Sequence, residues 1–167
     1  KQIEKKFGRI DVLINNAGIT SFKNVADESL EMIDDILDIN LEGPIVCTKA
    51  VLPGMIKRKH GWIINILSTV TIKTFKGSGA YTAAKEGLFG FSKVLREEVR
   101  EHNIKVINII PGATKTEMWH PKLRKKYGER MMKPQDVAEA VLNVYRMPEG
   151  VVAEDMVLRP VLGDLDA

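Results

Sequence analysis

The stretches DVLIN (residues 11–15), WIINIL (62–67) and KVINII (105–110) decide the fold. Each is a short, nearly continuous apolar run, which is typical of a strand buried on both faces. Patterns of helical periodicity separate them, and a last short strand is expected at 156–158. Strands joined by helical crossovers form a parallel sheet with right-handed connections. The sequence therefore predicts an α/β fold with a doubly wound parallel sheet.

The segments between the strands predict the helices. The tail of a helix is expected at 2–7, and an acidic cap at 27–29 precedes a helix with apolar residues three and four apart. A long helix over 41–59 is expected to end at the basic run 57–60 and Gly61, and another is expected over 80–102. Residues 113–133 are predicted to be loop-like and charged, and Pro134 opens a helix through 147.

Composition narrows the class of protein. The 167 residues suit one domain, and 25 Lys and Arg against 22 Asp and Glu leave +3 with the signs interleaved, which argues against a nucleic-acid binder. A single cysteine, Cys47, excludes an intrachain disulfide and a cysteine-rich metal site, so no metal is expected, and it suits a reducing cytoplasm. Apolar runs fall short of the ~20 residues of a membrane span, so no membrane association is expected.

Ligands of parallel sheets bind at the carboxyl ends of the strands, and polar residues follow the strands here. Tyr81 and Lys85 are four apart and share one helix face, where a lysine about 4 Å away would favour the phenolate by roughly 4 kcal/mol, or about 3 pKa units. The pKa of Tyr81 is therefore expected to fall towards neutrality. Ser68 could hold a substrate oxygen beside it. Taken separately, the pair also fits a helix start with a solvated lysine, and the serine fits a turn or cap.

The chain resembles the short-chain dehydrogenase/reductase family, most of all its single-domain branch with the 3-oxoacyl-[acyl-carrier-protein] reductases. The resemblance rests on five ordered motifs, which are Asn15-Asn16-Ala17-Gly18, Asn40, Ser68, Tyr81-x-x-x-Lys85 and Pro111-Gly112-x-x-x-Thr116. It implies a Rossmann-like fold and an enzyme that interconverts a carbonyl and an alcohol with NADP or NAD.

The resemblance also assigns roles to residues. Tyr81 would be the general acid or base, Ser68 would hold the substrate oxygen, and Lys85 would lower the tyrosine pKa and bind the nicotinamide ribose. Asn40 would anchor a proton-relaying water through its main chain. The remaining cofactor contacts would come from Asn16, Ala17, Gly18, Pro111, Gly112, Thr114 and Thr116. The Asn-Asn-Ala-Gly run also fits an architectural role at the sheet end.

One family feature is missing from these residues, the Gly-rich turn that receives the pyrophosphate. We therefore expect an N-terminally truncated sheet without its first three strands, with 1–167 as the catalytic, C-terminal portion of one domain. Strand 11–15 then lies at an edge. The 167 residues by themselves are expected to bind nicotinamide dinucleotides poorly and to show little turnover.

Residues 113–133 occupy the place of the family's substrate lid. They hold apolar Met118, Trp119, Met131 and Met132 and a basic run that fits an acyl carrier, a coenzyme A phosphate or a solvated surface. The helices at 41–59 and 80–102 resemble the family's interface pair, where small Gly87, Gly90 and Ser92 would allow a homodimer or homotetramer. Two alternatives remain, a nucleotide-sugar epimerase or dehydratase, and a catalytically silent interaction or structural module.

Overall fold

The computed structural model describes residues 2–165 and contains a four-stranded sheet in the order β1-β2-β3-β4. Its strands are β1 (Val12–Asn15), β2 (Gly61–Ile66), β3 (Ile104–Pro111) and β4 (Asp155–Leu158). All neighbours pair in parallel. The predicted strands are confirmed within one or two residues, and β1 lies at an edge of the described sheet as expected.

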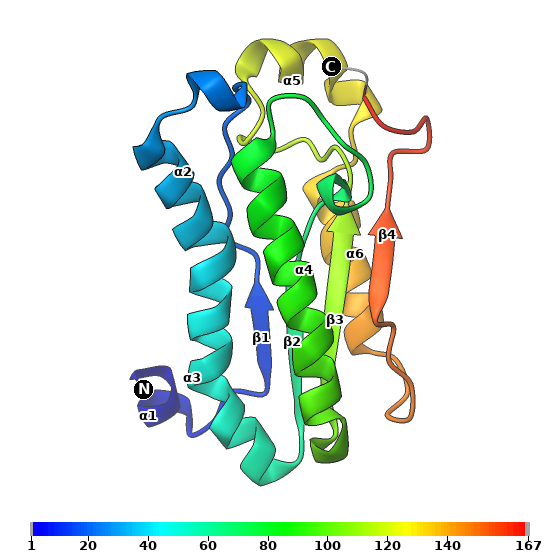
Figure 1. The fold of residues 1–167 in the computed structure, drawn as a ribbon. Helices are drawn as coiled ribbons and strands as arrows, with labels where there is room; N and C mark the ends of the chain where they lie inside the picture. The colour runs from blue at the N-terminus through cyan, green and yellow to red at the C-terminus, as the bar shows by residue number, and fades with distance from the viewer. Residues whose placement is uncertain (1, 166–167) are drawn as a thin grey trace.

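Helices cover both faces of the sheet (Figure 1). On one face α3 (Gly43–Arg58) and α4 (Gly79–Val99) pack against β2 and β3, and Met55, Ile63 and Leu95 are buried between them. On the other face α6 (Pro134–Tyr145) contributes Val144 to a second core that includes Ile107. The predicted doubly wound α/β arrangement is therefore confirmed.

The helix on the β1 side has a cap at its start and a π-turn within it. Ser29 caps α2 (Leu30–Leu37), because its side chain accepts a hydrogen bond from the Met32 N–H at 3.2 Å. A π-helical turn, η2 (Asp38–Glu42), then joins α2 to α3 without a break. Such turns are rare and occur frequently at functional sites, and this one holds Asn40.

The prediction that Gly61 ends this long helix is wrong. Lys59 takes the left-handed conformation that closes α3, with φ of 52°. Gly61 is instead the first residue of β2, where a Cβ would lie 2.5 Å from the Met55 sulfur. A glycine is needed there because the Met55 side chain fills the space.

The prediction that 113–133 is all loop is also wrong, because it contains α5 (Pro121–Tyr127) and η5 (Gly128–Arg130). Pro121 opens α5, and the His120 side chain caps it by accepting from the Lys122 N–H at 3.3 Å. Seven residues are too few to show an apolar period, so the pattern gave no signal.

The shorter elements complete the chain. They are α1 (Gln2–Phe7), as predicted, and the 3-10 turns η1 (Val25–Asp27), η3 (Thr69–Thr71) and η4 (Arg100–His102). Within residues 2–165, no helix combines the length and apolar character needed to cross a bilayer.

A polar row, buried at its three asparagines and exposed at Asp155, crosses the whole sheet. Asn15, Asn65, Asn108 and Asp155 occupy matching positions on the four strands. Their side chains bond in sequence, from Asn15 to Asn65 at 2.7 Å, from Asn65 to Asn108 at 3.4 Å and from Asn108 to Asp155 at 2.8 Å. The β2 member of this row, Asn65, lies three residues before Ser68, so the row holds the strands in register next to the predicted site.

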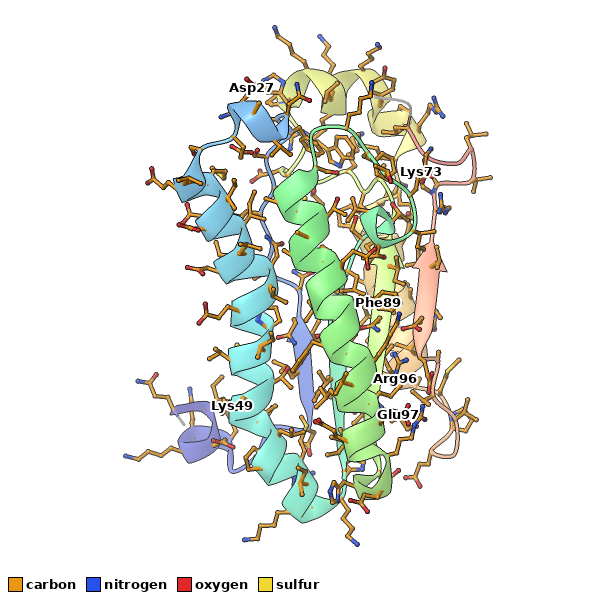
Figure 2. All side chains as sticks on the ribbon, in the orientation of Figure 1. Asp27, Lys49, Lys73, Phe89, Arg96 and Glu97 are labelled. Carbon is orange, nitrogen blue, oxygen red and sulfur yellow. The ribbon has the colours of Figure 1, made fainter. Side chains whose placement is uncertain are left out.

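Helix α4 is tied to this row at two points. Asn65 donates to the Ser92 hydroxyl at 2.9 Å, and Arg96, which α4 presents beside β4 (Figure 2), pairs with Asp155 at 2.9 Å. Ser92 is fully buried against the sheet. The prediction that Ser92 lies in a helix–helix interface is therefore wrong, whereas Gly87 and Gly90 are exposed on α4.

Candidate active site

Two elements bring Ser68, Tyr81 and Lys85 to the carboxyl edge of the sheet. Ser68 follows the last residue of β2 by two positions, and Tyr81 and Lys85 lie in the first two turns of α4. Tyr81 is 8% exposed and Lys85 only 3%. The alternative of a solvated lysine at a helix start is therefore wrong. A buried ammonium group requires a hydrogen-bond partner.

That partner is the main chain of β2. The Lys85 ammonium donates to the Ile66 carbonyl oxygen at 2.9 Å and lies 5.7 Å from the centre of the Tyr81 ring. Burial lowers the pKa of Lys85 from 10.5 to about 8. The side chain is thus still mainly protonated at neutral pH, but it holds its proton less tightly than an exposed lysine.

The pKa of Tyr81 moves the other way from the sequence-based expectation. Burial raises the pKa of the phenol, and hydrogen bonding to the Ser68 side chain lowers it by a smaller amount. The expectation that Lys85 brings this pKa towards neutrality is wrong for this structure, because the ammonium is bonded to Ile66 and desolvation dominates. Tyr81 is accordingly a protonated phenol at neutral pH.

Ser68 caps the η3 turn and also faces the candidate site. Its hydroxyl accepts from the Val70 N–H at 3.3 Å and caps η3, while its carbonyl accepts from the Thr71 hydroxyl at 2.8 Å. These bonds fix the serine where it reaches Tyr81. The cap interpretation is therefore correct, and it is compatible with a role at the site.

Asn40 and Gly18 lie together beside Lys85. Asn40 is fully buried and donates from its side-chain nitrogen to the carbonyls of Ile19 and Ile36, both at 2.8 Å. A Cβ on Gly18 would lie 2.7 Å from the Asn40 Oδ1 and 3.7 Å from the Lys85 Nζ. Any side chain at Gly18 would thus displace Asn40, while the water-anchoring role of Asn40 stays a prediction.

The other residues assigned to the cofactor follow β1 and β3 at the same edge. Asn15 is buried in the polar row, so that part of the Asn-Asn-Ala-Gly run is architectural, whereas Asn16 and Ala17 are exposed. On β3, Pro111 ends the strand and the Gly112 N–H donates to the Leu158 carbonyl at 2.8 Å.

Two threonines continue from that strand end. The Thr114 hydroxyl donates to the Gly112 carbonyl at 3.0 Å, and the Thr116 N–H donates to the Thr114 carbonyl at 2.8 Å. The structure therefore places all of the predicted positions at one edge of the sheet, and cofactor contact by each remains a prediction.

The donor set at this edge fits the ribose of a nicotinamide cofactor. Lys85 uses one of its three N–H groups on Ile66. The Asn40 Oδ1 is buried and accepts no hydrogen bond from any described residue. A hydroxyl-bearing ligand beside Gly18 can both accept from an ammonium and donate to an amide oxygen, so the residues present suit such a group.

Three contacts of the site escaped the sequence analysis. The Ile66 carbonyl as the acceptor for Lys85 and the Gly18–Asn40 contact depend on how helices pack on strands, and nothing in the sequence signals them. The stacking of Phe22 on Trp119, with ring centres 5.4 Å apart, joins segments that are about a hundred residues apart. For this last contact, the sequence offered only the presence of an aromatic residue, Phe22, in the loop after β1.

The comparisons with known proteins agree with this fold. The family described as short chain dehydrogenase matches residues 1–127. Sepiapterin reductase of Chlorobaculum tepidum is 34% identical over 163 residues, which are 98% of this chain and 66% of that protein. The closed form of serine dehydrogenase, complexed with NADP⁺, superimposes with a TM-score of 0.89 at 31% identity, over 97% of this chain and 69% of its own.

A 4-hydroxyisoleucine dehydrogenase complexed with NADH and succinate superimposes with a TM-score of 0.84 at 26% identity, over 95% of this chain and 70% of its own. The chain belongs to the short-chain dehydrogenase/reductase family. It spans about two thirds of the length of these relatives, between 66% and 70%.

Burial of Lys85 predicts a distinctive pH dependence of stability. Because its pKa falls from 10.5 to about 8 on folding, the unfolded chain binds more protons between these values, and stability rises with pH across that window. Relative to Lys85→Met, which lacks the titration, the free energy of unfolding of the wild type should rise on the order of 3 kcal/mol from pH 8 to pH 10.5.

Urea unfolding of both chains across this range measures the difference. Titrating groups that do not contact Lys85 behave alike in the two chains and cancel. A difference that stays constant with pH would contradict the burial of a protonated Lys85.

Proposed function

We propose that this protein is an NAD(P)-dependent oxidoreductase that interconverts a carbonyl and an alcohol by hydride transfer, with Tyr81 as the general acid or base. The 167 residues would supply the catalytic portion of a single domain. The observation that carries the proposal is the burial of Tyr81 and Lys85 one helical turn apart, with the Lys85 ammonium bonded to the Ile66 carbonyl two residues before Ser68.

The proton chemistry follows from these groups. A protonated phenol whose pKa is raised by burial is in the correct state to give its proton to a carbonyl oxygen as that oxygen becomes an alkoxide. Ser68, held by the η3 turn, donates a second hydrogen bond to the same oxygen. The Lys85 ammonium, 5.7 Å from the centre of the Tyr81 ring, would offset only part of the negative charge that remains on Tyr81 after transfer, because desolvation dominates there.

Bound NADPH or NADH supplies the hydride. On this chain, Lys85 would hold the ribose hydroxyls, and Asn40 would anchor a proton-relaying water through its main chain. Asn16, Ala17 and Gly18 would border the cofactor at the end of β1. Pro111, Gly112, Thr114 and Thr116 would flank its nicotinamide. The absence of a side chain at Gly18 supports this placement, because a Cβ there would occupy the space next to Lys85 and Asn40.

Replacing Tyr81 by Phe separates this enzyme from a catalytically silent module. The full-length protein carrying Tyr81→Phe should lose about 10²–10⁴-fold in kcat, as expected for removal of a general acid, while its melting temperature changes little. The matched control is Tyr145→Phe, because Tyr145 lies against Trp62 on the α6 side of the sheet.

Oxidation of NADPH and NADH with a panel of ketones and aldehydes measures the rates. Retention of the full rate by Tyr81→Phe would overturn the assignment. Absence of any rate in the wild type, with all substrates and both cofactors, would favour the structural or interaction module.

For the substrate, we propose a 3-oxoacyl group on an acidic carrier, delivered to the basic lid segment (residues 113–133). The relatives named above are not 3-oxoacyl reductases, so this proposal rests on charge. The lid segment carries seven Lys and Arg but only two Glu. The whole chain has 25 Lys and Arg and 22 Asp and Glu, so acidic residues outnumber basic ones outside this segment. Long basic side chains project outward from α5 (Figure 2).

Few of these charges are neutralised locally. Lys115 pairs with Glu129 at 3.1 Å, whereas Lys122 and Lys125 make no ion pair with any residue in 2–165. Such a patch raises the rate of encounter with a polyanion and loses that effect as salt screens it.

Charge removal on α5 tests the carrier proposal. Lys122→Gln, Lys125→Gln and Lys126→Gln together should raise the KM for a carrier-linked 3-oxoacyl substrate several-fold at low salt, as should ~0.5 M salt on the wild type. The KM for an uncharged thioester analogue should not change. The control is Lys5→Gln with Lys6→Gln on α1, at the opposite edge of the sheet. A KM insensitive to salt would contradict the proposal.

We further propose a homodimer or homotetramer in the cytoplasm, the compartment that a lone unpaired Cys47 suits. A groove between α3 and α4 is lined by Leu52, Ile56 and Phe91. Val46 on α3 and Val94 on α4 are more than half exposed. Apolar surface of this kind favours a protein–protein contact.

Val46→Glu with Val94→Glu should shift the protein to a smaller species in sedimentation velocity, because charged groups at the centre of an apolar interface are costly. Ile3→Glu on α1 is a control of similar exposure. A wild type that sediments as a monomer at all concentrations would contradict the assembly.

A further inference from the structure

The segment that follows β4 turns back towards the carboxyl edge of the sheet (Figure 1). This strap segment (residues 159–165) reverses direction in a tight turn, in which the Gly163 N–H donates to the Pro160 carbonyl at 2.8 Å. Gly163 has φ of +80°, a conformation that glycine adopts readily. Pro160 and Leu165, on the two sides of the turn, are both buried. The strap segment is therefore packed against the molecule at both ends.

The strap segment carries one nearly buried carboxylate. The Asp164 side chain is 8% exposed and pairs with two cations, Arg159 of the same segment and Lys73 at 3.6 Å. A buried carboxylate needs such partners, because its removal from water is costly. Lys73 belongs to the loop after β2 (Figure 2). The ion pair therefore joins the segment after β4 to a loop that follows a different strand.

The strand between these two also meets the strap segment at its end. The sheet order places β3 between β2 and β4. A Cβ on Gly112, the residue after β3, would lie 3.3 Å from the Pro160 Cδ and 3.6 Å from the Asp164 Oδ1. Asp164 thus lies against the end of β3 while its carboxylate pairs with Lys73. One carboxylate connects the segments that follow three neighbouring strands.

Lys73 ends the turn that Ser68 begins. The N–H groups of Lys73 and Ile72 both donate to the Thr69 carbonyl at 2.9 Å. The Thr71 N–H and the Thr71 hydroxyl both donate to the Ser68 carbonyl, at 3.1 and 2.8 Å. A chain of printed contacts therefore runs from the Asp164 carboxylate through Lys73 and this turn to Ser68.

The turn also determines what the Ser68 hydroxyl can do. That hydroxyl accepts a hydrogen bond from the Val70 N–H at 3.3 Å, so its single proton is left to donate to another group. A donor to a developing oxyanion acts when it lies about 2.7–3.1 Å from the position of that oxygen. A displacement of the turn by a fraction of this distance therefore weakens the contribution of Ser68 to the reaction.

We propose that Asp164 is a positioning residue for the reaction. Its ion pair with Lys73 fixes the turn that holds Ser68, so that the hydroxyl reaches the substrate oxygen. This rests on the hydride-transfer function proposed above, in which Ser68 donates to that oxygen. Asp164 acts through Lys73 and the turn and takes no part in the proton transfer.

Charge removal at either partner tests the proposal in the full-length protein. Lys73→Met and Asp164→Asn should each lower kcat about tenfold, less than the roughly 10²–10³-fold loss expected when a whole donor is removed. Together they should lose clearly less than the product of the single losses, because both break the same pair. Lys73→Arg should retain most of the rate. The control is Lys76→Met in the same loop, since Lys76 makes no ion pair with any residue in 2–165.

A cycle with Ser68 distinguishes positioning from a general loss of structure. In protein that already carries Ser68→Ala, Lys73→Met should lower kcat no further, because the group that Lys73 helps to position is gone. The KM for NADPH or NADH should stay the same in Lys73→Met. A tenfold loss that persists in the Ser68→Ala background would overturn the proposal, as would full rates in both Lys73→Met and Asp164→Asn.

Amide hydrogen exchange gives a readout that needs no turnover. The N–H groups of residues 71–73 are bonded within the turn, so exchange in a peptide spanning 68–73 should be several-fold faster in Lys73→Met than in the wild type or in Lys76→Met. The Lys73 side chain is 46% exposed, so its replacement should leave the fold intact, as the melting temperature would verify. Exchange that is unchanged in Lys73→Met would overturn the proposal.

This proposal and the proposed function can fail separately. Full activity of Tyr81→Phe would remove the proposed proton donor, and the exchange rates of residues 68–73 would still decide whether the ion pair fixes the turn. Loss of activity in Tyr81→Phe, with full activity in Lys73→Met and Asp164→Asn, would overturn the positioning role alone. Where Ser68→Ala is too slow for the cycle, or Asp164→Asn does not fold, the rate and the exchange of Lys73→Met decide.

Discussion

One hydrogen bond organises the candidate site, the bond from the Lys85 ammonium to the Ile66 carbonyl at 2.9 Å. Ile66 is the last residue of β2, so this bond fastens the start of α4 to the end of that strand. Tyr81 lies one helical turn before Lys85, and Ser68 lies two residues after Ile66. The same bond that gives a buried charge its partner therefore brings the phenol and the hydroxyl together.

Burial then determines the chemistry at this point. Desolvation lowers the pKa of Lys85 to about 8 and raises the pKa of Tyr81, so both groups are protonated in the neutral range. The polar row through Asn65 and Ser92 holds α4 on the sheet from below. The site thus combines a proton donor in the correct state with a supporting framework whose buried polar groups are bonded to each other.

Much of this arrangement follows from the sequence because its signals are local. The strands are apolar runs, Ser29 marks a helix start, and Tyr81 and Lys85 share a face by spacing alone. What the sequence did not reveal depends on packing. The short helix α5 has no period to detect, Ser92 faces the sheet through a bond to Asn65, and Gly61 is set by the Met55 side chain. The direction of the Tyr81 pKa likewise depends on burial, which spacing cannot give.

Transfer of deuterium tests the central claim most directly. Full-length protein is mixed with NADPH or NADH deuterated at the reactive position of the nicotinamide and with a ketone that supports turnover, and the alcohol is analysed by mass spectrometry. The account predicts one deuterium on the new carbinol carbon, delivered from one face of the nicotinamide. An alcohol formed without deuterium from either face of either cofactor would contradict direct hydride transfer at the Ser68–Tyr81–Lys85 site.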